Sequence, residues 1–390
     1  MNNRIYLDNA ATTLVSAEVL NEMMPCFSYV YGNSSSIHSF GRDASAIVDR
    51  ARDRIAKAIN AKSNEIYFTS GGTEANNWAV KGLAYANAKK GKHIITSSIE
   101  HDSVLESMHE LEKEGFEVTY LPVDKHGIVS LASLMHHIRK DTILISIMSV
   151  NNEVGTIQNI KAIGKTAHEK GIIFHTDGVQ ALGSLKIDVN EMEIDAMSIS
   201  AHKIYGPKGI GALYVKNGIQ IDNLICGGNQ ERKKRGGTVN VPAVAGFGKA
   251  VEIACRDLFV NQQKLKAIKQ YFISQVTEKI PYVHFNGHPQ QSIASTVNLS
   301  FELVEGESIL MLLDLEGIAV STGSACTSGS LEPSHVLKAM GVDDEISQGS
   351  IRFSFPKHIT KNDINTVVDT LVNVINKLRS ISPLTARRKK

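Results

Sequence analysis

Lys203 is the residue of this 390-residue sequence whose surroundings most clearly suit it to take part in a chemical reaction. It comes shortly after the apolar run DAMSIS and belongs to the stretch SAHKIYGPKGIG. Ser200 and His202 precede it, and glycines follow it. A lysine that is withdrawn from water loses its proton more easily, and its amine can then form an imine. A solvated surface cation is the usual alternative for a single lysine, but the neighbouring residues favour the imine.

Asp177 closes another apolar run, IIFHTD. An ionised carboxylate at the end of a strand can pair with the nitrogen of a pyridine ring and keep it protonated, so that the ring draws electrons from a bound carbon. A solvated turn residue or a helix N-cap is the alternative.

A glycine turn, Ser70-Gly71-Gly72-Thr73-Glu74, follows the run IYFTS and opens a helical pattern. The free backbone N–H groups and the positive dipole end of a helix suit one phosphate. The spacing matches neither a Walker loop nor the dinucleotide fingerprint, which argues against ATP and NAD. An N-capped turn with Thr73 as the cap is the alternative.

Four further polar residues lie at or within predicted strands. His101, in SIEHDSV, could stack on a flat ring and carry a proton near neutral pH, or it is a structural histidine. Asn152 and Gln180 follow two other strands and could hydrogen-bond a ring hydroxyl or a carboxylate. Arg352 lies in the apolar run SIRFSF, where it needs either a bound carboxylate or an internal ion pair.

Cys326 lies among small residues in STGSACTSGSLEP. Such a composition predicts an exposed loop that carries the thiol into and out of a pocket, with an ordinary cysteine at a turn as the alternative. We expect Cys26, Cys226 and Cys255 to be structural by comparison. No CxxC spacing occurs, which argues against a zinc site or a disulfide framework.

Short apolar runs alternate with amphipathic helical stretches between about residues 65 and 215. This pattern predicts a mostly parallel sheet covered on both faces, with ligands beyond the carboxyl ends of the strands. The runs STVNLSF, IAVST and SIRFSF predict a small α+β domain after a long helical segment near 243–279. The strand candidates of the first region are IYFTS, HIITSS, EVTYLPV, TILISIMSV, IIFHTD, DAMSIS and GALYV.

The charge balance excludes several partners. Lys and Arg (42) nearly cancel Asp and Glu (40), so nothing favours nucleic acid or a membrane surface. The longest apolar run, about 142–150, is half of the ~18 residues that a membrane-spanning helix requires. The first residues have no secretory or organellar leader pattern, so we expect a cytoplasmic protein.

Taken together, the motifs resemble the cysteine desulfurases of the NifS and IscS type over residues 5 to 380. The resemblance implies the class V aminotransferase group and a homodimer. It also implies the aspartate-aminotransferase-like fold (pyridoxal phosphate fold type I), with a seven-stranded sheet in the large domain. We expect an N-terminal segment 1–15 that packs with the small domain, a large cofactor domain 16–255, a small domain 256–385 and a frayed tail 386–390. The motifs are LDNAATT, YGNSSSIHSFG, TSGGTEANN, EHDSV, NNEVGT, HTDGVQALG, SAHKIYGPKGIGALY, RGGTVNVP, VEGES, STGSACTSGSLEPSHVL and SIRFS.

The same resemblance implies a role for each site residue. Lys203 forms a Schiff base with pyridoxal phosphate, Asp177 pairs with the ring nitrogen, Gln180 with the ring hydroxyl, and His101 stacks on the ring and moves protons. Gly72, Thr73, Ser200 and His202 hold the phosphate, together with Thr238 of the other subunit. Asn152 and Arg352 hold the substrate carboxylate, and Cys326 is the nucleophile that becomes a persulfide.

The implied reaction converts L-cysteine to L-alanine and a persulfide on Cys326. The expected acceptor is an iron–sulfur scaffold of the NifU or IscU type, and a growing cluster would contact Cys326 only transiently, with no intrinsic metal. Ser34, Gly178 and Ala294-Ser295 depart from the usual family residues near the pocket. A selenocysteine lyase, an aminotransferase and a catalytically silent assembly subunit are the alternatives.

Overall fold

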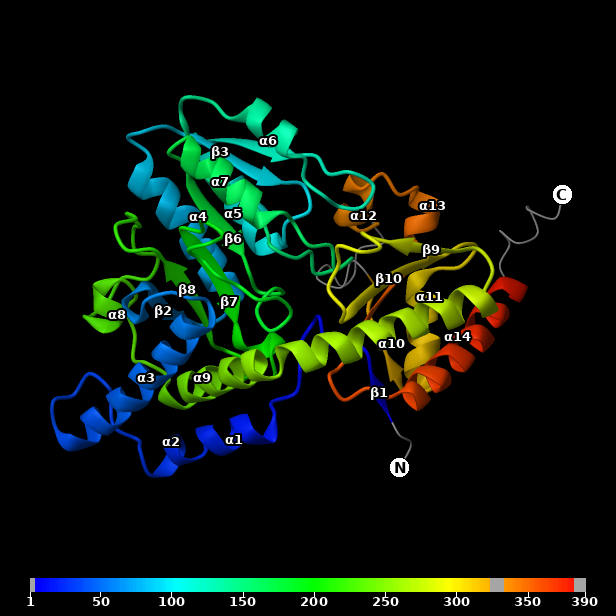
Figure 1. Ribbon diagram of the computed structural model, residues 1–390, viewed down its shortest axis with the longest axis horizontal. Helices are drawn as coiled ribbons and strands as arrows, with labels where there is room; N and C mark the ends of the chain where they lie inside the picture. The colour runs from blue at the N-terminus through cyan, green and yellow to red at the C-terminus, as the bar shows by residue number, and fades with distance from the viewer. Residues whose placement is uncertain (1–3, 323–332, 382–390) are drawn as a thin grey trace.

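The computed structural model describes residues 4–322 and 333–381, which form a large sheet and a smaller one at opposite ends of the molecule (Figure 1). The large sheet has seven strands, all at the predicted apolar runs, and only β8 runs antiparallel to its neighbours. The prediction of a mostly parallel sheet is therefore confirmed. In spatial order the strands are β2 (Ile66–Thr69), β8 (Gly211–Val215), β7 (Ala196–Ser200), β6 (Ile173–Asp177), β5 (Thr142–Ser146), β3 (His93–Ser97) and β4 (Glu117–Leu121).

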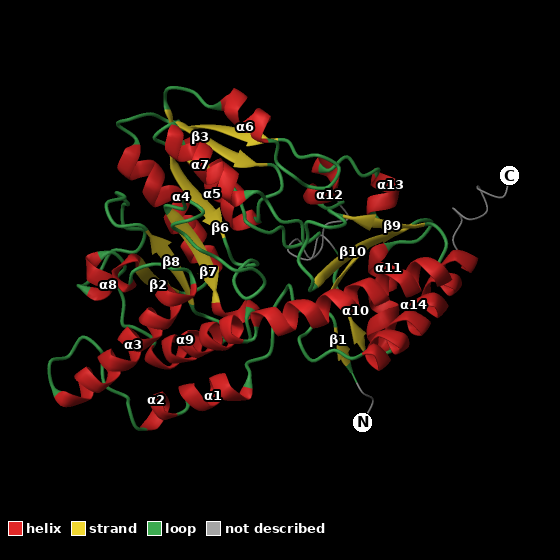
Figure 2. Cartoon of the chain, viewed as in Figure 1, coloured by secondary structure: helices red, strands yellow, loops and turns green. Residues whose placement is uncertain are grey.

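Helices cover both faces of this sheet, as Figure 2 shows by the red layers around the yellow strands. Successive strand residues alternate between the two cores: Ile94 packs on one face and Ile95 on the other. One face is covered by α4 (Gly72–Asn87) and α5 (Asp102–Lys113). The other is covered by α3 (Ser39–Ala58), α6 (Leu131–His137), α7 (Ile160–Glu169) and α9 (Val241–Arg256), with α1 (Ala17–Met23) and α2 (Pro25–Ser28) against α9.

The second sheet is antiparallel and has its own core, in which Phe272 packs against Phe353. Ile5 and Leu7 belong to this core, because β1 (Ile5–Tyr6) pairs with β11 (Ile318–Ala319). The sheet contains β9 (Val283–Asn286), β10 (Thr296–Phe301) and β12 (Ser350–Ser354), and the helices around it are α10 (Leu258–Lys279), α11 (Gly306–Leu315), α12 (His335–Ala339), α13 (Asp344–Ser347) and α14 (Lys361–Ile381).

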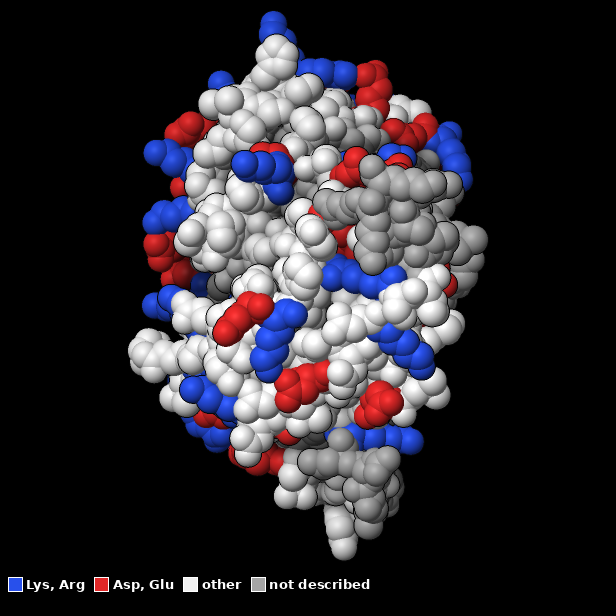
Figure 3. Space-filling model, turned by 90° about the vertical axis from the view of Figure 1, so that its right-hand side faces the viewer, with Lys and Arg blue, Asp and Glu red and all other residues white. Residues whose placement is uncertain are grey.

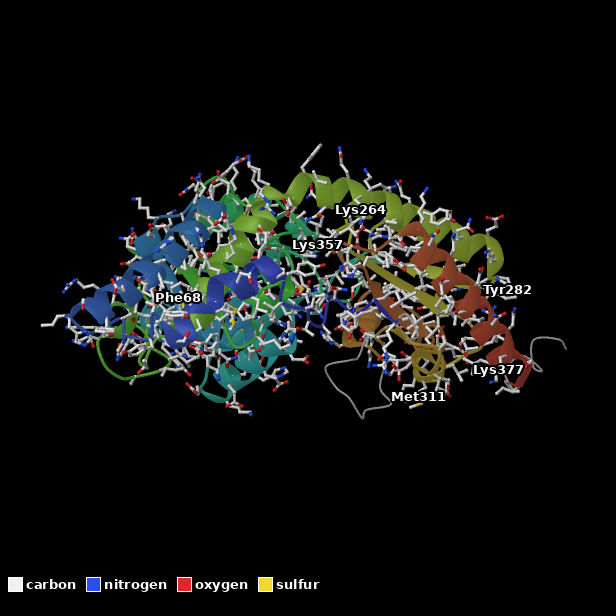
Figure 4. The ribbon with its side chains drawn as sticks, turned by 90° about the horizontal axis from the view of Figure 1, so that it is seen from below. Phe68, Lys264, Tyr282, Met311, Lys357 and Lys377 are labelled. Atoms are coloured by element: carbon white, nitrogen blue, oxygen red, sulfur yellow. The ribbon has the colours of Figure 1, made fainter. Side chains whose placement is uncertain are left out.

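The long helical segment after residue 240 is two helices, α9 and α10, that meet at Asp257. Near this junction Lys264 Nζ donates to the carbonyl oxygen of Lys357 at 2.8 Å, where the two parts of the molecule meet (Figure 4). The first turns of α10 therefore connect the large sheet's helical layer to the small sheet.

Two surface features bear on the expectations. Cys26 is buried, whereas Cys226 and Cys255 are exposed. Positive and negative side chains are interspersed on the face in Figure 3. None of the helices described here has the length and apolar character needed to cross a membrane.

Candidate active site

A cavity of about 300 Å³ lies at the carboxyl ends of the parallel strands, where the predicted site residues meet. Nine of those residues line it, and Ser200 is buried directly beside Gly72. Thr238 does not line this cavity, and Cys326 lies outside the described residues. The lining is Ala10, Ala11, Gly72, Thr73, Asn76, His101, Ser103, Met148, Val150, Asn152, Asp177, Val179, Gln180, His202, Lys203 and Arg352.

Lys203 ends the short 3-10 turn η2 (Ala201–Lys203), which follows β7 directly. Its Nζ donates to the carbonyl oxygens of Ala10 at 2.5 Å and Ala11 at 2.8 Å. Gln180 Nε2 donates to the same carbonyl of Ala10 at 3.1 Å. The carbonyl groups of the N-terminal segment therefore hold the amine of Lys203 at one side of the cavity.

Asp177 ends β6 and is buried, with both carboxylate oxygens engaged. Oδ1 accepts from the backbone N–H of Val179 at 2.9 Å, and Oδ2 accepts from Asn76 Nδ2 at 2.7 Å. Both oxygens of the carboxyl group therefore have hydrogen-bond donors, which fix its orientation. The cavity thus has an amine and a carboxylate on its lining, as Lys203 and Asp177 were predicted to provide.

His101 is the N-cap of α5, not a residue within a strand or helix. Its Nδ1 accepts from the backbone N–H of Ser103 at 3.0 Å and lies 2.9 Å from Ser103 Oγ. Ser103 and Asn76 both line the cavity and were missed by the sequence analysis. The signal for Ser103 was its place two residues after a histidine that follows a strand.

The turn at the start of α4 has no side-chain cap in the described part of the chain. Helix α4 begins at Gly72, and its N-cap, Gly71, supplies no side-chain hydrogen bond, so Thr73 is not the cap. A side chain at Gly72 would come within 2.8 Å of Val179 Cγ2, which explains the glycine. The hydroxyl of Ser200 is buried and has no hydrogen-bond partner in the described part of the chain.

His202 lies beside this turn as a neutral group. Burial, together with the nearby charges of Lys203 and Lys208, lowers the pKa of His202 to about 4. Its Nδ1 lies 3.2 Å from Thr12 Oγ1. A neutral imidazole can offer a hydrogen bond to an anion without adding a second positive charge next to Lys203.

Arg352 forms the internal ion pair that the sequence left open as one of its two options. Nη2 donates to Asp8 Oδ1 at 2.9 Å, and Nη1 donates to the carbonyl oxygen of Asn152 at 3.0 Å. The buried Nε has no partner among the residues described. The guanidinium is held in one orientation and retains donors for a carboxylate in the cavity.

Two buried carboxyl groups lie behind the cavity. Burial raises the pKa of Glu100 to about 8, although the hydroxyl of Ser97 and the N–H of Met148 both donate to Oε1. Burial also raises the pKa of Glu153, whose Oε2 accepts from Ser334 at 2.5 Å. Because Ser334 is the N-cap of α12, this bond anchors the chain just after the region that contains Cys326.

The fold and this cavity define a class of protein. Residues 5–367 match the family described as Aminotransferase class-V, and the chain belongs to that family. The particular group follows from the relatives. The chain is 53% identical over 383 residues to a cysteine desulfurase IscS of Dictyoglomus turgidum, covering 98% of this chain and 97% of the relative.

It is 52% identical over 386 residues to a cysteine desulfurase IscS of Methanosarcina thermophila, covering 99% and 95% of the two chains. Among solved structures, a NifS-like protein aligns with a TM-score of 0.91 at 38% identity, covering 96% of this chain and 99% of that one. A structure described as SspA in complex with cysteine aligns with a TM-score of 0.81 at 38% identity, covering 91% and 100%. The chain therefore belongs with the cysteine desulfurases of the class-V family.

Proposed function

We propose that the protein is a pyridoxal phosphate-dependent cysteine desulfurase that releases L-alanine and leaves the sulfur as a persulfide on Cys326. The proposal rests on one observation. The amine of Lys203 and the carboxylate of Asp177, each oxygen of which accepts a hydrogen bond, line the same cavity. The membership in the cysteine desulfurase group supports the choice of substrate.

The residues present fit the cofactor. The unpartnered hydroxyl of Ser200, the uncapped start of α4 at Gly72 and Thr73, and the neutral His202 would hold the phosphate. Asp177 would pair with the ring nitrogen. Gln180 would hydrogen-bond the ring hydroxyl, and His101 would lie against the ring. When bound, pyridoxal phosphate supplies an electron sink for the substrate carbon.

The chain's own residues would then perform three tasks. Arg352 and Asn152 would hold the α-carboxylate of cysteine, and the amine of Lys203 would remove and return protons at the substrate carbon. The thiolate of Cys326 would attack the substrate sulfur, so that an S–S bond forms as the C–S bond breaks. The electron pair of the broken bond goes to the carbon, which takes up a proton and leaves as alanine.

We also propose a homodimer in which Thr238 of each chain reaches the cofactor site of the other chain. Thr238 is exposed and lies away from its own chain's cavity. Large apolar side chains are exposed on and after α1 and α2, among them Phe27, Tyr29 and Tyr31 at 61%, 81% and 66% exposure. Such an apolar surface is typical of a subunit interface.

The remaining assignments extend the same proposal. Residues 256–385 would form the small domain with the Cys326 loop, segment 1–15 would pack with it, and residues 16–255 would form the large domain. The separate cores around Phe247 and around Phe272 support this division. A cytoplasmic iron–sulfur scaffold of the NifU or IscU type would accept the persulfide. Cluster assembly on such a scaffold, with cysteine as the sulfur source, tests that partner.

The direct test measures alanine and sulfide from L-cysteine with a reductant present, and equal amounts are expected. Lys203→Ala should abolish both products and leave no borohydride-reducible imine to the protein, whereas the matched change at exposed Lys208 should preserve both. Cys326→Ala should keep the yellow cofactor and lose sulfide. Sulfide release at the normal rate by Cys326→Ala would exclude the persulfide role, and a preference for selenocysteine would favour a selenocysteine lyase.

A further inference from the structure

A hydrogen-bonded chain of four side chains runs from the cavity wall to Asp177. Asn76 Nδ2 donates to Asp177 Oδ2 at 2.7 Å and to Ser103 Oγ at 2.9 Å. Ser103 Oγ in turn lies 2.9 Å from His101 Nδ1. Asn76, Ser103 and Asp177 are all more than 90% buried, so water does not compete for these bonds.

The direction of the chain is fixed at its His101 end. The backbone N–H of Ser103 donates to His101 Nδ1 as the N-cap bond of α5, so Nδ1 carries no proton. Turning the ring over would set a C–H group against this N–H and leave the helix uncapped. The proton of the neutral ring is therefore on Nε2, and the hydroxyl of Ser103 donates to Nδ1.

The rest of the chain follows from this start. Because the hydroxyl proton of Ser103 points to His101, its oxygen accepts from Asn76, and the other N–H of that amide points to Asp177. This orientation leaves Asn76 Oδ1 buried without a partner in the parts of the chain described. The opposite orientation would set that oxygen against the carboxylate, which is worse than leaving it unpaired.

We propose that Asn76 and Ser103 are positioning residues that hold His101 as a neutral ring with its proton on Nε2. His101 then acts as a fixed hydrogen-bond donor to an oxygen or sulfur of the bound substrate and not as a carrier of protons. Its Nδ1 lone pair is occupied by the cap, and Nε2 makes no hydrogen bond to any residue in the described ranges. This inference rests on the proposed desulfurase function for its substrate and replaces the proton-carrying role expected from the sequence.

Two substitutions at position 101 separate the roles. His101→Gln places an N–H donor near the position of Nε2 but cannot carry a proton, whereas His101→Asn keeps an acceptor for the cap and loses the donor. We expect kcat for alanine formation to fall by less than about tenfold in His101→Gln and by about 100-fold or more in His101→Asn, the scale of a lost preorganised donor. Equal losses of about 100-fold or more in both variants would overturn the proposal, since a proton carrier is lost in both.

The protonation state is measured directly by ¹⁵N NMR of the holoenzyme labelled at histidine, with His101→Gln used to assign the His101 signals. We expect a protonated Nε2 and an unprotonated Nδ1. Both Ser103→Ala and Asn76→Ala should shift the Nδ1 signal.

Ser107→Ala is the matched control, because Ser107 Oγ donates to the carbonyl oxygen of Ser103 outside this chain, and it should leave the signal in place. A proton on Nδ1, or no shift in either variant, would overturn the proposal. This result stands even if the protein forms no alanine from cysteine, so it is separable from a failure of the proposed function.

Discussion

The buried ion pair between Arg52 and Glu231 offers a quantitative test of how the Thr238 segment is held. Arg52 binds Glu231 through two bonds of 2.7 and 2.8 Å, and Glu231 Oε2 also accepts from the N–H of Phe68 at 2.9 Å. Glu231, Arg232 and Lys233 are three consecutive residues with positive φ (44°, 55° and 65°). Each costs about 1–2 kcal/mol in this conformation, so the turn needs such anchors to persist.

Glu231→Ala leaves the charge of Arg52 buried and unpaired, which costs about 3–5 kcal/mol. An unfolding entropy of about 2.1 cal/mol/K per residue gives about 0.8 kcal/mol/K for the 390 residues, so a loss of about 4 kcal/mol lowers Tm by about 5 °C. The affinity for pyridoxal phosphate should fall as well, because Thr238 follows this turn by a few residues and is proposed to reach the partner's site.

Thermal unfolding of the holoenzyme and titration with pyridoxal phosphate measure the two effects. Glu252→Ala is the matched control, since Glu252 is 40% exposed in its pairs with Arg54 and Lys249 and its removal should cost at most about 1 kcal/mol. If Glu231→Ala lowered Tm no more than this control, the reasoning from burial would be refuted.

Three further predictions concern Glu100, Lys233 and Asp8. Burial raises the pKa of Glu100 to about 8, so the native state retains a proton that the unfolded state releases near pH 4.3. The free energy of unfolding should therefore fall as pH rises from about 4.3 to 8. In Glu100→Gln, urea unfolding should show this fall reduced by at least about 1 kcal/mol. Lys233→Gly should raise stability by about 0.5–1 kcal/mol in the same assay by relieving the positive φ, and Lys233→Ala should not. Asp8→Asn removes the ion pair that orients Arg352, so KM for cysteine should rise by about tenfold with a smaller change in kcat, and an unchanged KM would contradict the orienting role.

The sequence predicted the large sheet and much of the cavity for one physical reason. Parallel strands buried on both faces are continuous apolar runs, and their carboxyl ends meet at one edge, so a polar residue just after such a run is placed by the fold. Asp177, His101 and Lys203 were found in this way, and all three line the cavity. Arg352 was found by the opposite signal, a charge within an apolar strand.

Other features depend on contacts between distant residues and had no local signal. Strand β1 has two residues and exists only because it pairs with β11, more than 300 residues later. The turn at 231–233 contains no glycine, although its backbone is left-handed, and it is fixed by Arg52 from another helix. Nothing in the local sequence distinguishes Asn76 from an ordinary helical residue, and only the fold brings it next to Asp177.

The N-terminal segment has a larger part in the site than its distance in sequence suggests. Its carbonyl groups at Ala10 and Ala11 accept from Lys203, and its Asp8 pairs with Arg352. The same segment enters the small core at Leu7 and pairs through β1 with the strand β11 that precedes the region of Cys326. One segment therefore holds both the amine of Lys203 and the guanidinium of Arg352, and that segment is packed beside the strand that leads to the proposed nucleophile.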